Sequence, residues 1–136
     1  DLGIPLNTDS TLKGQMIFAA ERASELFYED LLTDRSIIDV MAFTKLAKSI
    51  GNVEKMDFED LYSRLISEYD YVFYISPQGV DIEDNGTRTT DSEYRDDIDY
   101  VINRYIELYE DKFKNFNRIS GTTEDRIKQV LEIISL

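Results

Sequence analysis

The sequence feature that most constrains the fold is residues 70–76, with the sequence DYVFYIS, in which five consecutive residues are β-branched or aromatic. Pro77 follows directly, so the run predicts a β-strand that stops at the proline. Its apolar character is continuous rather than alternating, which is typical of a parallel strand covered on both faces. Segments of helical periodicity precede and follow it, and we therefore expect an α/β fold with a parallel sheet.

Helix caps and hydrophobic periodicity predict the remaining elements. Two short strands are expected at residues 31–33 and 116–119, the first of them buried. The first two expected helices are residues 9–29, capped by Asp9 or Ser10, and a helix that begins at the cap Ser36 and stops at Gly51. The next two are residues 58–67, capped by Asp57, and residues 91–114. A last helix is capped by Thr122. The apolar residues expected to bury the last helix are Ile127, Val130, Leu131, Ile133 and Ile134.

Composition excludes several kinds of site. The 136 residues fit one domain and contain no Cys and no His, which excludes a disulfide, a thiolate nucleophile, a Ser-His-Asp triad and a Cys/His zinc site. Any metal must be bound through oxygen, which favours Mg²⁺. A formal charge of -13 disfavours duplex nucleic acid and anionic membranes as partners. No segment reaches the roughly 20 apolar residues of a membrane span and none resembles a signal peptide, so we expect a cytoplasmic protein.

Asp34, Arg35, Ser36 and Asp39 form the first of three polar clusters. They directly follow the strand predicted at residues 31–33, and ligands of α/β sheets gather at the carboxyl ends of strands. An acid and a base at that place can meet a phosphorylated ligand and its metal. The alternative is a helix cap, with Asp39 near the positive end of the helix dipole.

The second cluster lies in the polar residues 78–95, a predicted loop that leads into a helix. Arg88 lies close to Gly86 in an acidic segment, and Arg95 follows one turn into the helix. This arrangement is typical of a lid that brings positive charge onto phosphoryl groups. The alternative is a solvated charged loop without a specific role.

The third cluster, residues 120–126, lies at a predicted strand-to-helix turn and contains Gly121, Thr122 and Arg126. Simple capping of the last helix is the alternative to a binding role, since Gly-Thr caps are ordinary.

Together the three clusters resemble P-loop nucleoside and nucleotide kinases, and within them the AAA-type ATPase/kinase group similar to nicotinamide riboside kinase domains. The resemblance rests on residues 33–39 (TDRSIID), 71–77 (YVFYISP), 84–88 (DNGTR), 94–95 (YR) and 119–126 (ISGTTEDR). It covers most of the chain in order. It implies a three-layer α/β/α fold with a parallel sheet, and Mg²⁺-assisted transfer of the γ-phosphoryl group of ATP to a nucleoside, nucleotide or nicotinamide riboside-like acceptor.

The resemblance also implies roles for individual residues. Asp34 would hold Mg²⁺ or polarise the acceptor hydroxyl, Arg35 would contact phosphate or substrate, and Ser36 and Asp39 would bind substrate. Arg88 and Arg95 would be lid arginines over the phosphates of ATP, while Gly121, Thr122 and Arg126 would lie near its adenine. Phosphoryl transfer consists mainly of positioning and charge neutralisation, which carboxylates, Mg²⁺ and arginines supply without His or Cys.

One motif of that family is absent. Its phosphate-binding loop, Gly-x-x-x-x-Gly-Lys-Ser/Thr, does not occur, because none of the six glycines is followed by lysine. A strand, loop and helix of that kind take at least ~30 residues. We therefore expect residues 1–136 to be the C-terminal portion of a single larger kinase-like domain that lacks its first strand here, with residues 78–95 as its lid, and to be inactive alone. Two alternatives stay open: a non-catalytic ATP-binding or regulatory module with a kinase-like fold, and a plain acidic interaction domain.

Overall fold

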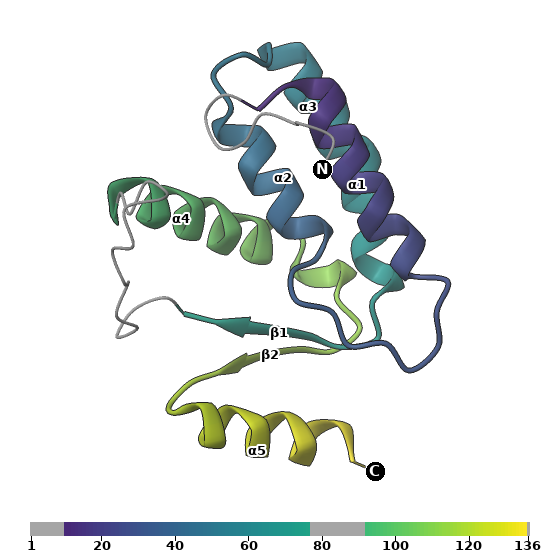
Figure 1. Ribbon diagram of the computed structural model, residues 1–136, viewed down its shortest axis with the longest axis vertical. Helices are drawn as coiled ribbons and strands as arrows, with labels where there is room; N and C mark the ends of the chain where they lie inside the picture. Colours follow the sequence, from purple (N-terminus) through teal and green to yellow (C-terminus); the bar gives the residue numbers. More distant parts are fainter. Residues whose placement is uncertain (1–9, 77–91, 136) are drawn as a thin grey trace.

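The computed structural model describes residues 10–76 and 92–135. In chain order its elements are α1 (Leu12–Glu25), α2 (Ile37–Leu46), α3 (Asn52–Tyr62), the 3₁₀ helix η2 (Ser63–Glu68), β1 (Val72–Ile75), α4 (Ser92–Leu108), the 3₁₀ helix η3 (Glu110–Lys112), β2 (Phe116–Ile119) and α5 (Thr123–Ile134). The fold is α/β and mostly helical. Helices α2 and α4 lie on one side of the strands, and α5 lies on the other (Figure 1).

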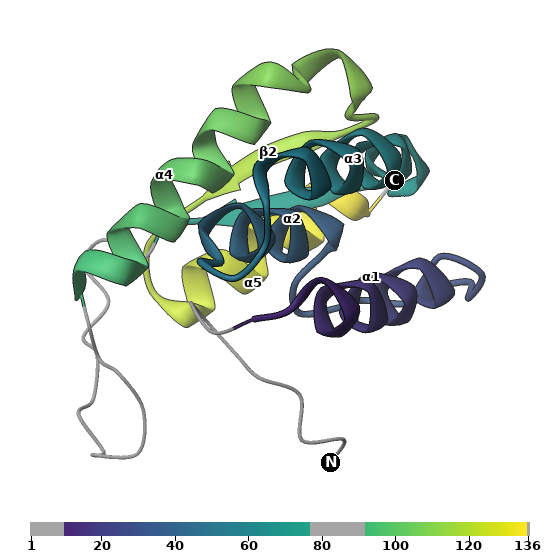
Figure 2. The ribbon, with the colours of Figure 1, turned by 90° about the horizontal axis from the view of Figure 1, so that it is seen from above.

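The two strands pair in parallel, with Val72 opposite Phe116 and Ile75 opposite Ile119. The strand predicted at residues 70–76 is confirmed over residues 72–75, and the strand predicted at residues 116–119 is confirmed in full. Parallel neighbours cannot be joined by a tight turn, and the connection between β1 and β2 contains α4. Seen from above, α4 runs roughly along the two strands, as a crossover helix does (Figure 2).

The strand predicted at residues 31–33 is wrong. These residues have no regular structure, and Leu31 and Leu32 are 50% and 81% exposed. A strand needs a neighbour for its backbone N–H and C=O groups, and the sheet formed by the described residues contains β1 and β2 only. The first polar cluster therefore follows an exposed loop and not the end of a buried strand.

Helix α2 is the centre of the hydrophobic core. Its buried residues are Ile37, Ile38, Val40, Met41, Ala42 and Thr44. It is surrounded by α1, α3, η2 and α4, which explains why apolar residues occur on most sides of it. A buried polar link also joins it to α1, because Gln15 Nε2 donates to Thr44 Oγ1 at 3.0 Å. This packing holds the N-terminal end of α2, which carries the first polar cluster, in a fixed place.

Several predicted helix boundaries are wrong by a few residues, because other residues cap the helices. Thr11 caps α1 in place of residue 9 or 10, and its Oγ1 accepts a hydrogen bond from the Gly14 N–H at 3.1 Å. Helix α2 ends before Gly51, which is instead the N-cap of α3. Asp57 consequently lies inside α3 and does not begin it. The helix predicted over residues 91–114 ends at Leu108, and the short η3 follows.

The apolar and aromatic stripe of α4 packs in the core, as its periodicity predicts. Ile98, Tyr105 and Ile106 are buried. The hydroxyls of Tyr105 and Tyr109 both donate to the carboxylate of Glu59 on α3, at 3.1 and 2.6 Å. These two bonds tie the C-terminal half of α4 to α3.

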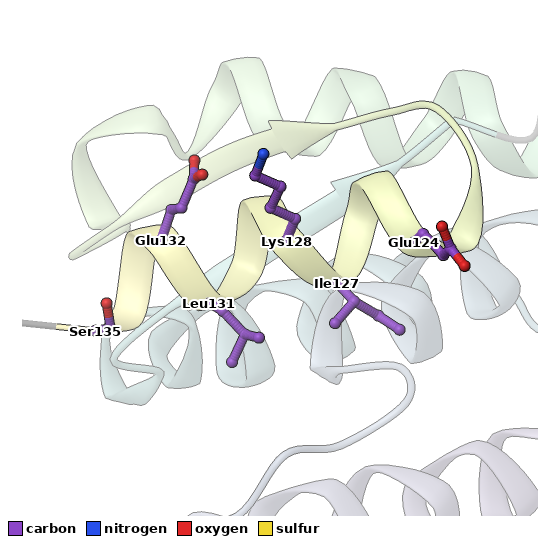
Figure 3. A pocket seen from close by; sticks show the side chains of 6 residues that line it. All are labelled: Glu124, Ile127, Lys128, Leu131, Glu132 and Ser135. Carbon is purple, nitrogen blue, oxygen red and sulfur yellow. The ribbon is translucent and has the colours of Figure 1, made fainter.

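The predicted burial of α5 is wrong. None of its residues is buried, and Ile127 and Leu131 are each 55% exposed. Both side chains point to the same side of the helix, opposite to Lys128 and Glu132, and they line a surface pocket (Figure 3). A two-stranded sheet is too narrow to cover the apolar side of this helix. Among the described residues, no helix is long and apolar enough to cross a membrane.

Candidate functional site

A pocket of about 400 Å³ lies between the N-terminal end of α2, α4 and β1. Its charged and polar lining residues are Asp34, Arg35, Ser36, Asp39, Tyr74, Arg95 and Asp99. Aliphatic and aromatic side chains complete the wall, and the volume is in the range of small-molecule sites. The whole first polar cluster thus lines the same pocket as Arg95, which lies far from it in sequence.

Capping chemistry fixes the α2 end of this pocket. Ser36 Oγ accepts from the Ile38 N–H at 3.1 Å, and Asp39 Oδ2 accepts from the Ser36 N–H at 2.8 Å, as in a capping box. The hydroxyl of Tyr69 accepts from the Ile37 N–H at 3.0 Å. The cap predicted as an alternative is therefore formed, by residues that also line the pocket. Because these N–H groups already have acceptors, side chains must supply the charge that holds an anion.

Arg35 supplies one such charge and has an unusual backbone. Its φ of 80° lies in the left-handed region, where a residue other than glycine costs about 1–2 kcal/mol. Its guanidinium lies 5.6 Å from the ring centroid of Phe43, a cation–π contact at the pocket wall. Asp30, in the same loop, also has a positive φ, of 55°, so this conformation is a property of the loop between α1 and α2 and does not by itself mark a binding site.

Asp39 is the most deeply placed carboxyl of the cluster. Burial raises its pKa above the ordinary 3.8, while the hydrogen bond from the Ser36 N–H and the charge of Arg35 lower it. Burial affects the pKa of Asp39 more than the hydrogen bond or the charge does. The side chain thus pairs an acceptor role in the cap with a position in the pocket lining.

Arg95 supplies the second positive charge. Its Nε is buried and has no hydrogen-bond partner among the described residues, and the same holds for the hydroxyl of its neighbour Tyr94. Buried donors in proteins are nearly always paired, so an orphaned guanidinium N–H in a pocket wall is a place where a ligand can accept a hydrogen bond. Arg95 is therefore the predicted site residue whose surroundings point most directly to a ligand.

The sequence prediction missed a polar network that joins α4 to the two strands beside the pocket. Tyr74 on β1 donates its hydroxyl hydrogen to Asp99 Oδ1 on α4 and accepts from Asn103 Nδ2 at 3.0 Å. Arg118 NH1 on β2 donates to Asn103 Oδ1 at 3.1 Å and stacks on Tyr74, 4.9 Å from its ring centroid. One signal was present in the sequence, because Asp99 follows Arg95 by one helical turn and so lies on the same face of α4.

Asp34, the predicted metal ligand, is exposed at the rim of the pocket, and its backbone oxygen accepts from Arg22 NH1 at 3.4 Å. Within residues 10–76 and 92–135, no group of three or more acidic side chains is arranged to hold a metal ion. Mg²⁺ is usually bound by one or two carboxylates together with substrate phosphates and water. Asp34 fits that mode of binding, and does not fit a metal cage built from protein groups.

The third cluster lies apart from this pocket. Gly121 has φ 99°, Thr122 caps α5, and Arg126 donates to Thr122 O and Thr123 Oγ1, so the visible contacts of the cluster are local. None of these residues lines the pocket beside β1. Their contact with adenine stays a prediction, and Arg88 with most of the predicted lid lies outside the described residues.

Comparisons of the chain with protein-family models, with curated proteins and with solved structures found no match.

Proposed function

We propose that this chain forms the acceptor and phosphate-contacting side of an ATP-dependent small-molecule kinase. The γ-phosphoryl group of ATP would pass to a nucleoside, nucleotide or nicotinamide riboside-like acceptor. The observation that supports this best is the convergence of Asp34, Arg35 and Arg95 on one pocket, from a loop and a helix that are distant in sequence. The lining as a whole carries three carboxylates and two guanidinium groups, and phosphoryl transfer uses carboxylates for Mg²⁺ together with guanidinium groups for the phosphates.

Each residue has a distinct task in this proposal. Arg35 and Arg95 hold phosphate oxygens, and the Nε of Arg95, which has no hydrogen-bond partner within the described part of the chain, is a donor for this use. Ser36 and Asp39 shape the acceptor side, although their capping bonds leave only part of each side chain for a substrate. Asp34 binds the acceptor hydroxyl or shares Mg²⁺ with ATP, and the ion, when bound, neutralises charge on the transferred group.

The triphosphate needs further donors that these residues do not supply. None of the six glycines precedes a lysine, so a P-loop lysine must come from elsewhere in the polypeptide. Among the described residues, β2 is the only strand that pairs with β1, so one edge of β1 has no neighbour there. The apolar residues Ile127 and Leu131 of α5 are half exposed. A further parallel strand beside β1 would use both features, and we place the phosphate-binding loop after such a strand.

The test is ATP consumption by the full-length protein with Mg²⁺ and a panel of nucleosides and nucleotides, in the wild type and in Asp34→Asn. Turnover in the variant should fall at least about 100-fold, since it loses a charge that acts on the reacting groups, while its thermal unfolding stays unchanged. Asp30→Asn is the matched control, because Asp30 is exposed in the same loop, does not line the pocket, and has φ 55°, which Asn tolerates well. Equal turnover in Asp34→Asn and Asp30→Asn would refute the role of Asp34.

A non-catalytic ATP-binding module is the second candidate, because Ser36 and Asp39 on the acceptor side already make the capping bonds of α2. It predicts that the full-length protein binds ATP but phosphorylates no acceptor. Calorimetric titration with ATP, run beside the turnover assay, separates the two functions.

A further inference from the structure

The loop that carries Asp34 and Arg35 is fixed from outside by a side chain of α1. NH1 of Arg22 donates a hydrogen bond to the backbone oxygen of Asp34 at 3.4 Å. Arg22 belongs to the last turn of α1 and does not line the pocket. It therefore contacts the candidate site through the backbone of Asp34 and not through the pocket itself.

Arg22 is itself held in place. Its Nε lies 3.1 Å from Oε1 of Glu25, and the two side chains are only 22% and 25% exposed. Helix α1, which carries both residues, is fixed on α2 by the buried hydrogen bond between Gln15 and Thr44. Because different nitrogens of one planar guanidinium serve Glu25 and Asp34, this group bridges α1 and the loop in a defined geometry.

The other end of the same segment is held as well. The hydroxyl of Tyr69 accepts from the Ile37 N–H at 3.0 Å. Between the two ends, Thr33 Oγ1 donates to the backbone oxygen of Arg35 at 3.1 Å. The backbone from Asp34 to Ile37 is thus tied at each end by a side chain from another part of the fold.

The side chain of Asp34 depends on this backbone for its position. Its carboxylate makes no hydrogen bond or ion pair within residues 10–76 and 92–135, and it is exposed at the rim of the pocket. A movement of the loop would therefore carry the carboxylate away from the pocket. Reaction rates are sensitive to such displacements, since a misplacement of about 1 Å can cost about 100-fold.

Resting on the proposed kinase function, we propose that Arg22 is a positioning residue that holds the carboxylate of Asp34 where it meets the acceptor hydroxyl or Mg²⁺. Arg22 acts through Asp34 and touches neither substrate nor metal ion. Its loss should lower kcat and leave the KM for ATP unchanged, and it should matter only while residue 34 carries a carboxylate.

The experiment is a double-mutant cycle in the full-length protein, with Arg22→Gln, Asp34→Asn and the double variant. We expect kcat to fall at least about 10-fold in Arg22→Gln, because the carboxylate is no longer held in place. In the Asp34→Asn background the same substitution should change kcat by less than about 2-fold, because a residue that acts through another has no effect once that one is lost.

The matched control is Glu25→Gln, which removes the charge of the ion pair while an oxygen stays available to Nε of Arg22. Its kcat should stay within about 2-fold of the wild type, since partly exposed ion pairs contribute little. An equal loss of kcat in Glu25→Gln, or equal losses from Arg22→Gln in both backgrounds, would overturn the inference and leave the kinase function intact. Absence of turnover with every acceptor would instead overturn the kinase function.

A second measurement decides on Arg22 without turnover. Hydrogen exchange of the Ser36 and Ile37 backbone amides follows local opening of the loop, and thermal unfolding shows that each variant folds. In Arg22→Gln these amides should exchange about 10-fold faster than in the wild type and in Glu25→Gln, the upper range of one hydrogen bond. Exchange as slow as in the wild type would refute the role of Arg22, whether or not any acceptor is phosphorylated.

Discussion

Removal of the phenolic oxygen of Tyr69 should destabilise the N-terminal end of α2, which forms one side of the pocket. The hydroxyl of Tyr69 accepts from the backbone N–H of Ile37 at 3.0 Å, and Ile37 is fully buried. In Tyr69→Phe this N–H loses its acceptor in a place that water does not reach. An unsatisfied buried donor costs about 1–3 kcal/mol, so the free energy of unfolding should fall by that amount.

For a domain of this size, 1 kcal/mol corresponds to roughly 3–5 °C in the melting temperature. Thermal and urea unfolding followed by circular dichroism give the two quantities. The matched control is Tyr71→Phe, since the hydroxyl of Tyr71 has no hydrogen-bond partner among the described residues and its ring stacks on Phe73 in either case. A loss below about 0.5 kcal/mol in Tyr69→Phe, or an equal loss in both variants, would refute the assignment of Tyr69 as the acceptor that anchors α2.

Two pH-dependent effects follow from the shifted pKa values. Burial raises the pKa of Asp39 above 3.8, so its stabilising contribution is complete below pH 3.8 and is lost as the pH rises through the folded pKa. Asp39→Asn keeps an acceptor for the cap and should flatten the plot of unfolding free energy against pH in that range. An equally steep plot in the variant would contradict this. Burial, aided by Glu59, raises the pKa of Tyr109 to about 12 and that of Tyr105 as well, so stability should fall as the pH rises from about 10 to about 12. The absorbance of tyrosinate, followed against pH, measures these pKa values. Glu59→Gln should lower the pKa of Tyr109. An unchanged tyrosine titration in that variant would show that burial alone raises the pKa.

The elements with strong local signals were predicted from the sequence. The strand at residues 72–75 is recognisable because five consecutive β-branched or aromatic residues end at a proline. The caps Ser36 and Thr122 are recognisable because each is followed three residues later by an aspartate that returns a hydrogen bond. Residues 31–33 were misjudged since three apolar residues do not distinguish a buried strand from an exposed loop.

Part of the candidate site was also predicted. The first cluster was found because an acid, a base and a cap follow one another in the chain, and Arg95 was found from its place after an acidic loop. Asp99, Tyr74 and Arg118 were missed, since each taken alone is an ordinary residue of an amphipathic helix or of a strand. Only the tertiary network distinguishes them: Tyr74 donates to Asp99, Asn103 donates to Tyr74, and Arg118 donates to Asn103 and stacks on Tyr74.

The sequence by itself determined the α/β class, two of the three predicted strands and the limits on chemistry set by the absence of His and Cys, because these depend on composition and on local periodicity. Only the tertiary structure decided that Asp34, Arg35 and Arg95 share a pocket with Asp99, and that the apolar side of α5 stays half exposed. Such facts depend on which elements pack together, and packing brings together residues far apart in the chain in a way that no local pattern encodes.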